Sequence, residues 1–107
     1  MSLVSQERLE QALIYLAETD EPAALAKAKA ERLKVYGKTV KAYGFLDAVG
    51  TVAEREAMSV TTDEYLKWLE ELESAIMDSE QYINKRSTEA GIREVWRSLN
   101  ANRRQGA

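Results

Sequence analysis

The sequence has 107 residues, a formal net charge of −3, and neither cysteine nor histidine. The lack of both residue types excludes a disulfide framework, a thiolate metal site and the usual histidine bases of enzymes. The chain has no apolar run long enough to span a membrane and no signal-peptide pattern, so we expect a soluble cytoplasmic protein.

The composition predicts an all-α fold. Only one proline and five glycines occur, and 31% of the residues are charged, which is typical of a helical chain with few loops. We predict one domain, residues 1–107, built as an elongated antiparallel hairpin of two long helices with a short N-terminal helix and coiled-coil-like packing. The expected helices cover residues 5–18, 22–57 and 62–104.

The first expected helix ends before Pro22. Its apolar residues, which share one helical face, are Leu9, Ala12, Leu13 and Leu16. Thr19 or Asp20 can cap the following helix, and proline suits a first helical turn because it has no amide hydrogen to leave unpaired. These signals predict a helix boundary between residues 18 and 22.

The second expected helix has a core-facing side and a basic side. The residues predicted to face the core are Leu25, Leu33, Tyr36, Val40 and Tyr43. Beyond Gly44 the apolar residues change phase, so either the helix is irregular up to Gly50 or its second half is covered on two sides. We favour the second alternative within a continuous helix, because a glycine inside a helix costs only about 1 kcal/mol and can let another backbone come close.

The third expected helix begins after Thr61, where a hydroxyl at the N-cap and the carboxylate of Glu64 three residues later form a capping box. One apolar row contains Tyr65, Leu69, Leu72, Ile76 and Ile83, and a second row beside it contains Trp68, Ala75 and Tyr82. Gly91 is the position where this helix could break.

The charges are distributed unevenly along the chain. Residues 42–80 carry two basic and ten acidic side chains, whereas residues 22–41 and 81–107 together carry twelve basic and three acidic ones. The basic residues form two rows at helical spacing and are the candidate contacts to phosphate or nucleic acid: Lys27, Lys34, Lys38, Lys41, Arg86, Arg93, Arg97 and Arg104. The alternative is a solvated face whose charges pair with Glu89, Glu94, the acidic N-terminal helix or the acidic half of a second protomer.

A hairpin two helices wide cannot cover all of the apolar rows. The residues left for self-association are Phe45, Val49, Val52, Trp68 and Tyr82. Exposed apolar surface of this extent is unusual on a monomer. We therefore expect a homodimer or a larger homo-oligomer.

The carboxylates show no complete catalytic or metal-binding pattern. Glu7 with Glu10, and Glu70 with Glu73, supply the Glu-x-x-Glu half of the magnesium motif of all-helical nucleotide pyrophosphohydrolases, but no Glu-x-x-Asp follows either pair. A phosphate-binding glycine loop and a nucleophile elbow are also missing from the sequence. We expect no enzyme activity, no cofactor and no metal, and a metal-dependent nucleotide hydrolase is the least favoured function.

Several segments resemble a group of small phage and prophage proteins of undefined function. They are residues 16–20, 51–57, 63–65, 84–86 and 94–104. The genes of that group often lie among phage recombination and replication genes, which implies a role near DNA in a bacterial host cell. The resulting hypothesis is a non-catalytic, self-associating accessory protein whose basic end contacts DNA or a DNA-processing partner; the alternative is a purely structural or assembly protein.

Overall fold

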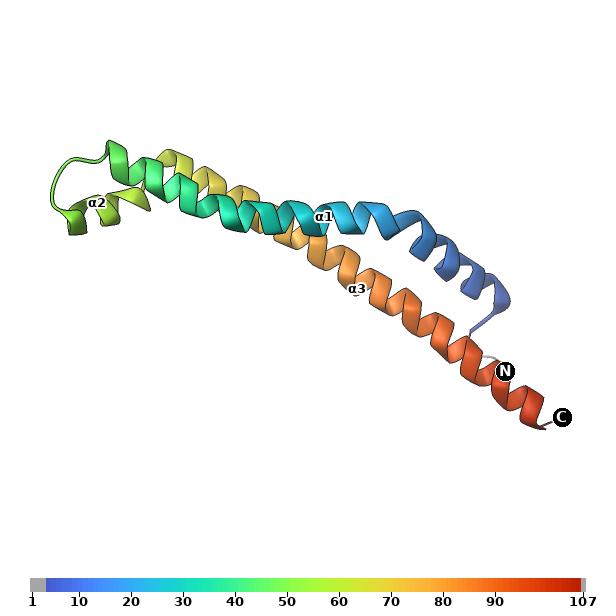
Figure 1. Cartoon of the computed structure of the whole chain (residues 1–107). Coiled ribbons are helices and arrows are strands. Elements are labelled where there is room, and N and C mark those ends of the chain that lie inside the picture. Colours follow the sequence, from blue (N-terminus) through green and yellow to red (C-terminus); the bar gives the residue numbers. More distant parts are fainter. Residues whose placement is uncertain (1–3, 107) are drawn as a thin grey trace. The chain divides into compact units, whose positions relative to one another are not determined.

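The computed structural model describes residues 4–106, with side chains described for residues 4–103. Residues 4–106 contain three α-helices and no strand: α1 (Gln6–Asp47), α2 (Val52–Ser59) and α3 (Asp63–Gly106). Figure 1 shows the short α2 between the two long helices along the chain. The predicted all-α class is confirmed.

The described residues pack as two compact units. Unit 1 consists of the residues up to Ala24 and those from Glu80 onward, and unit 2 consists of Leu25–Ser79. Each unit contains one part of α1 and one part of α3, and α2 belongs to unit 2. The sequence predicted one domain, whereas the packing divides the chain into these two units.

Each helix begins at a hydroxyl residue. Ser5 Oγ accepts a hydrogen bond from the Arg8 amide at 3.0 Å, and Thr62 Oγ1 accepts one from the Tyr65 amide at 3.1 Å. Thr51 accepts from the Glu54 amide at 3.2 Å. These bonds satisfy amides that have no partner inside the helix. The cap of α3 is therefore Thr62 without the predicted contribution of Glu64.

The predicted helix boundary between residues 18 and 22 is wrong. α1 runs without interruption from Gln6 to Asp47, and Pro22 lies inside it. The expected capping residue Thr19 has its hydroxyl engaged elsewhere, because it donates to the Tyr15 carbonyl oxygen at 2.6 Å. No separate short N-terminal helix exists among the described residues.

The predicted continuity of the second helix through Gly50 is also wrong. α1 ends at Asp47, and Gly50 has φ of 133°, a conformation that only glycine adopts easily. Thr51 then caps the separate helix α2 and also contacts Glu54 Oε1 through its hydroxyl at 3.1 Å. A threonine followed three residues later by a glutamate is a capping signal, and it outweighed the helical spacing of the apolar residues.

The core of unit 2 is built around small residues of α1. Gly37 lies against the Trp68 ring, which occupies the space that a side chain at Gly37 would need. The Trp68 Nε1 donates a hydrogen bond to the Leu33 carbonyl oxygen at 2.7 Å. Gly44 lies against the backbone of Ser59. The two glycines let later parts of the chain approach α1 closely because they have no Cβ.

This packing corrects the predicted core face of α1. Val40 is buried, with 8% of its surface exposed, and Leu33 is half-buried. Leu25, Tyr36 and Tyr43 are 63%, 52% and 64% exposed, so their predicted burial is wrong. A large ring from α3 needs a small residue opposite it, and this requirement turns the glycine side of α1 inward.

The inward face of α3 combines the two predicted apolar rows. Its buried and half-buried residues recur at spacings of three and four: Tyr65, Trp68, Leu72, Ala75, Ser79, Tyr82, Arg86 and Glu89. From Ser79 onward most of these residues are polar. α3 continues through Gly91 without a break. The surroundings of Gly91 are open, since an added Cβ would meet nothing within 4 Å.

Candidate functional site

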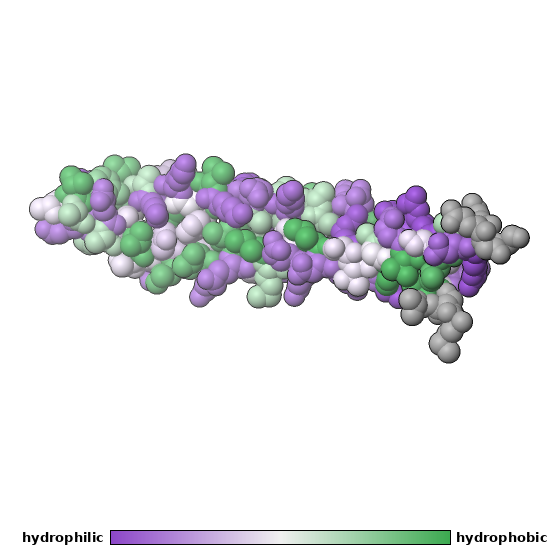
Figure 2. Space-filling view, turned by 90° about the horizontal axis from the view of Figure 1, so that it is seen from below, coloured by the Kyte–Doolittle hydropathy of each residue, from purple (hydrophilic) through white to green (hydrophobic). Residues whose placement is uncertain are grey.

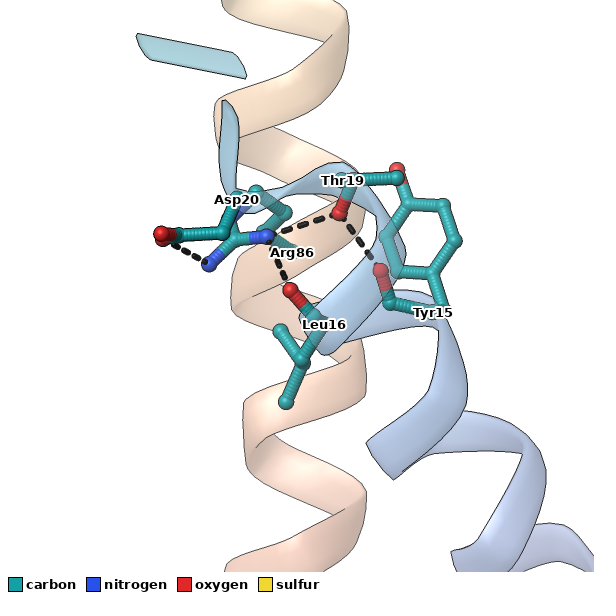
Figure 3. Close-up of polar contacts among 5 residues, drawn as sticks. All are labelled: Tyr15, Leu16, Thr19, Asp20 and Arg86. Carbon is teal, nitrogen blue, oxygen red and sulfur yellow. Dashed lines mark hydrogen bonds and ion pairs between the residues drawn. The ribbon is translucent and has the colours of Figure 1, made fainter. Parts of the chain in front are cut away.

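A polar contact site lies in unit 1, where Arg86 of α3 reaches one turn of α1 (Figure 3). Its Nη1 donates hydrogen bonds to the Leu16 carbonyl oxygen at 2.8 Å and to Thr19 Oγ1 at 2.7 Å. Its Nη2 lies 3.4 Å from Asp20 Oδ1. Only 25% of the Arg86 side chain is exposed. The guanidinium therefore joins two helices by directed hydrogen bonds.

The same turn of α1 immediately precedes Pro22. A proline inside a helix removes one backbone hydrogen bond and costs about 3 kcal/mol. A hydrogen bond from a charged donor contributes about 1.5–3 kcal/mol, so the two short bonds from Arg86 can offset the proline. Lys85 Nζ adds a further contact, 4.6 Å from the centroid of the Tyr15 ring.

A second ion pair in unit 1 involves a buried carboxylate. Arg8 Nη2 lies 2.9 Å from Glu89 Oε1 and 2.8 Å from Glu89 Oε2, and only the first contact has hydrogen-bond geometry. The Glu89 side chain is 10% exposed. A buried carboxylate without a partner is strongly destabilising, so this pair specifies which part of α1 can lie beside Glu89.

The sequence named Thr19 and Asp20 as helix caps, and Arg86 and Glu89 as a phosphate contact and a charge partner. It did not identify Arg8, Tyr15 or Lys85 as members of these contacts. Arg86 and Glu89 lie on the inward face of α3, following Ser79 and Tyr82 at spacings of three and four. Charged residues that continue an apolar row in this way are a signal for polar contacts between helices. Their partners Arg8 and Leu16 lie 81 and 70 positions away, so local sequence does not identify them.

The predicted arginine row does not form one free cationic face. Arg86 is used within unit 1, which corrects its assignment as a phosphate contact. Arg93 Nε and Arg97 Nη1 lie 3.6 Å and 3.2 Å from Glu94 Oε1, and both arginines remain exposed. The side chain of Arg104 lies outside the described residues. The pairing with Glu94 is the arrangement that the solvated-face alternative predicted.

The predicted lysine row lies in unit 2 and is exposed. It consists of Lys27, Lys34, Lys38 and Lys41 of α1. Lys34 Nζ lies 3.7 Å from Glu31 Oε1. Because this ion pair is on the surface it is weak, and another anion can displace Glu31 from Lys34. Because these lysines and the arginines belong to different units, we treat them as two separate surfaces.

The residues predicted for self-association fall into two groups. Phe45 and Trp68 contact their own chain, since Arg55 lies 4.2 Å above the Phe45 ring and Trp68 lies against Gly37. Tyr82 is half-buried. The exposed group is Val49 and Val52 together with further apolar side chains of unit 2: Leu46, Met58, Val60, Leu66 and Met77. Figure 2 shows apolar side chains on the surface, including the end where α2 lies.

The acidic residues form no metal-binding cluster within the described part of the chain. Glu7, Glu10, Glu70 and Glu73 are all exposed. Among residues 4–106, no three acidic side chains lie close enough together to hold a metal ion. None of the described helices has the length and apolar character needed to cross a lipid bilayer.

Comparison of the chain with known proteins finds no matching family model, no similar curated protein and no similar solved structure.

Proposed function

We propose that this protein is a non-catalytic helical assembly protein that joins copies of itself through the apolar surface of unit 2. The observation that carries the proposal is the exposure of large apolar side chains around α2. Val49 is 86% exposed, and Leu46, Val52, Met58 and Val60 are also exposed. A second chain is the simplest cover for such a surface.

The core of a single chain is small, which supports the same proposal. The buried apolar residues in the described part are Val4, Ala12, Ala30, Val40 and Ala75, and no large side chain there is fully buried. Burial of apolar surface is the main favourable term in folding. Contacts between copies would add the burial that one chain lacks.

We further propose that α1 and α3 continue as an antiparallel hairpin with coiled-coil-like packing. Within unit 2, Gly44 lies near Thr62 and Gly37 near Trp68. Within unit 1, Thr19 bonds Arg86 and Arg8 bonds Glu89. In both units, the α1 residue with the lower residue number contacts the residue with the higher number at or after the start of α3. This order is expected of antiparallel neighbours.

Light scattering across a range of concentrations tests the assembly. We expect the wild-type chain to have the mass of a dimer or a larger oligomer. The double variant Leu46→Asp/Val49→Asp should be monomeric yet helical, because both side chains are already exposed in one chain. Gln11→Asp, at an exposed position of unit 1, introduces a carboxylate elsewhere and should leave the mass unchanged. A monomeric wild type would contradict the proposal.

The exposed lysine row favours DNA contact as a second candidate function. The four lysines lie on one side of α1 and outside its packed face. Ammonium groups in such a row can neutralise successive phosphates. The predicted resemblance to phage proteins encoded near recombination genes, and the bacterial cytoplasm as their location, agree with this candidate and remain predictions.

Binding of single- and double-stranded DNA at several salt concentrations tests the second candidate. Lys34→Gln/Lys41→Gln should weaken binding and reduce the slope of log affinity against log salt by about two. Lys29→Gln/Lys67→Gln removes the same charge from exposed positions outside the row and should have little effect. Equal loss in both variants would show that only the total charge matters.

Two further alternatives are less favoured. A purely structural protein with solvated charges would assemble as proposed but bind no DNA at physiological salt. A metal-dependent nucleotide hydrolase would lose activity when Glu70 and Glu73 are replaced by glutamine, and hydrolysis assays with magnesium test it directly.

A further inference from the structure

A hollow of about 270 Å³ lies on the surface of unit 2, between α1 and the beginning of α3. It is lined by Tyr36, Val40, Tyr43, Gly44, Asp47, Thr62 and Glu64. The hollow exists because Gly44 has no side chain and Ser59 and Thr62 approach it closely, within 3.1 Å and 3.4 Å of where its Cβ would be. Its size suits one long side chain better than a drug-sized ligand.

The lining residues favour a cation. Tyr36 and Tyr43 are two helical turns apart on α1 and expose most of their surface. Asp47 and Glu64 supply two exposed carboxylates, and none of the seven described lining residues is basic. Tyrosine rings attract cations through their faces, and a carboxylate beside the ring strengthens that attraction.

We propose that this hollow binds an arginine side chain from the α3 helix of a second copy of the chain. The inference rests on the proposed self-association and specifies which surfaces meet. Arg93 and Arg97 are exposed on α3, and their described ion pairs are contacts to the neighbouring Glu94. Such surface pairs are weak and exchange readily.

Charge complementarity identifies the occupant. Residues 42–80, which contain most of the hollow, carry two basic and ten acidic side chains, whereas residues 81–107 carry six basic and two acidic ones. Arginine stacks on aromatic rings and forks toward carboxylates better than lysine does. Arginine and tyrosine are also the residues that most often dominate binding energy at interfaces. The contact joins two different surfaces, so it is a heterologous one.

A charge-swap experiment on the full-length chain tests this inference by sedimentation at several concentrations. The hollow variant Asp47→Lys/Glu64→Lys and the helix variant Arg93→Glu/Arg97→Glu should each raise the concentration at which half the chains assemble by at least tenfold. An equimolar mixture of the two variants should assemble nearly as well as wild type, because the reversed charges then match between different chains. Glu70→Lys/Glu73→Lys makes the same charge change at exposed positions outside the hollow and should assemble as wild type does.

A second pair of variants leaves every charge in place. Tyr36→Ala/Tyr43→Ala should weaken assembly by a similar factor, and Tyr36→Phe/Tyr43→Phe should retain it because the rings remain. These variants keep the test valid if lysine at position 64 disturbs the start of α3, which circular dichroism would detect.

The outcomes separate this inference from the proposed function. Assembly of wild type with no change in the hollow variants, or no recovery in the mixture, overturns the arginine contact and leaves self-association standing. Binding of free arginine or choline to the hollow with no change in wild-type assembly would show a small-molecule site and also overturn it. A monomeric wild type overturns both.

Discussion

The two units hold α1 against α3 by different means. In unit 2 the contact is close and largely apolar, with Gly37 and Gly44 allowing the Trp68 ring and the Ser59 backbone to approach α1. In unit 1, where Val4 and Ala12 are buried, Arg86 and Glu89 on α3 also bond to side-chain and carbonyl groups of α1. Among the described residues, side-chain hydrogen bonds between α1 and α3 are therefore more numerous in unit 1 than in unit 2.

Folding stability and the choice of which helix segments pair therefore depend on different contacts in this chain. Apolar burial is non-directional and scales with area. Buried charged groups contribute little net stability but make a shifted pairing costly, because a shift would leave Glu89 without Arg8. We infer that unit 2 supplies most of the stability and that unit 1 selects the pairing.

The largest expected effect follows from breaking the core of unit 2. Val40→Asp places an unpaired carboxylate where 8% of the native side chain is exposed, so we expect a loss of about 3–5 kcal/mol or complete unfolding. Thermal unfolding followed by circular dichroism measures the loss. Lys38→Glu, at an exposed position of the same helix, should change the melting temperature far less. Equal losses would mean that α1 is rotated differently.

A matched pair of glycine substitutions tests the close approach. Gly37→Ala should destabilise by about 1–3 kcal/mol, because the Trp68 ring occupies the site of the new methyl group and is held by its bond to Leu33. Gly91→Ala should stabilise by about 0.5–1 kcal/mol, because its surroundings are open and alanine favours a helix. Urea denaturation measures the change in the free energy of unfolding, which we expect to be a loss for Gly37→Ala and a gain for Gly91→Ala. A gain in stability in both variants would show that Gly37 is not tightly packed.

A smaller effect is expected from the polar contacts of unit 1. Arg86→Met should destabilise by about 2 kcal/mol and increase amide hydrogen exchange in residues 16–21. The cost should fall in the Pro22→Ala background, because an intact helical hydrogen bond makes the support of Arg86 less necessary. Arg97→Met removes an exposed arginine paired with Glu94 and should cost less than 1 kcal/mol. Additive effects of Arg86→Met and Pro22→Ala would show that the two features are independent.

The helical class and the exposure of the lysine row were predictable from the sequence, whereas a break of α3 at Gly91 was left open. These properties depend on helix propensity and on the spacing of residues a few positions apart, which a local pattern contains. The capping signal at Thr51 and Glu54 was also present in the sequence. It predicts that a new helix begins after Thr51, so that α1 ends before this residue.

Which face of α1 is packed, and whether Pro22 ends a helix, depend on contacts that form only in the folded chain. Their bulk and spacing predicted Tyr36 and Tyr43 as core residues, but the space opposite α1 is filled by Trp68, whose partner Leu33 lies 35 positions away. Thr19 was expected to cap a helix, but its hydroxyl bonds Arg86, 67 positions away. Whether a small residue faces inward, or the Thr19 hydroxyl meets a donor from α3, depends on side chains that only folding brings together.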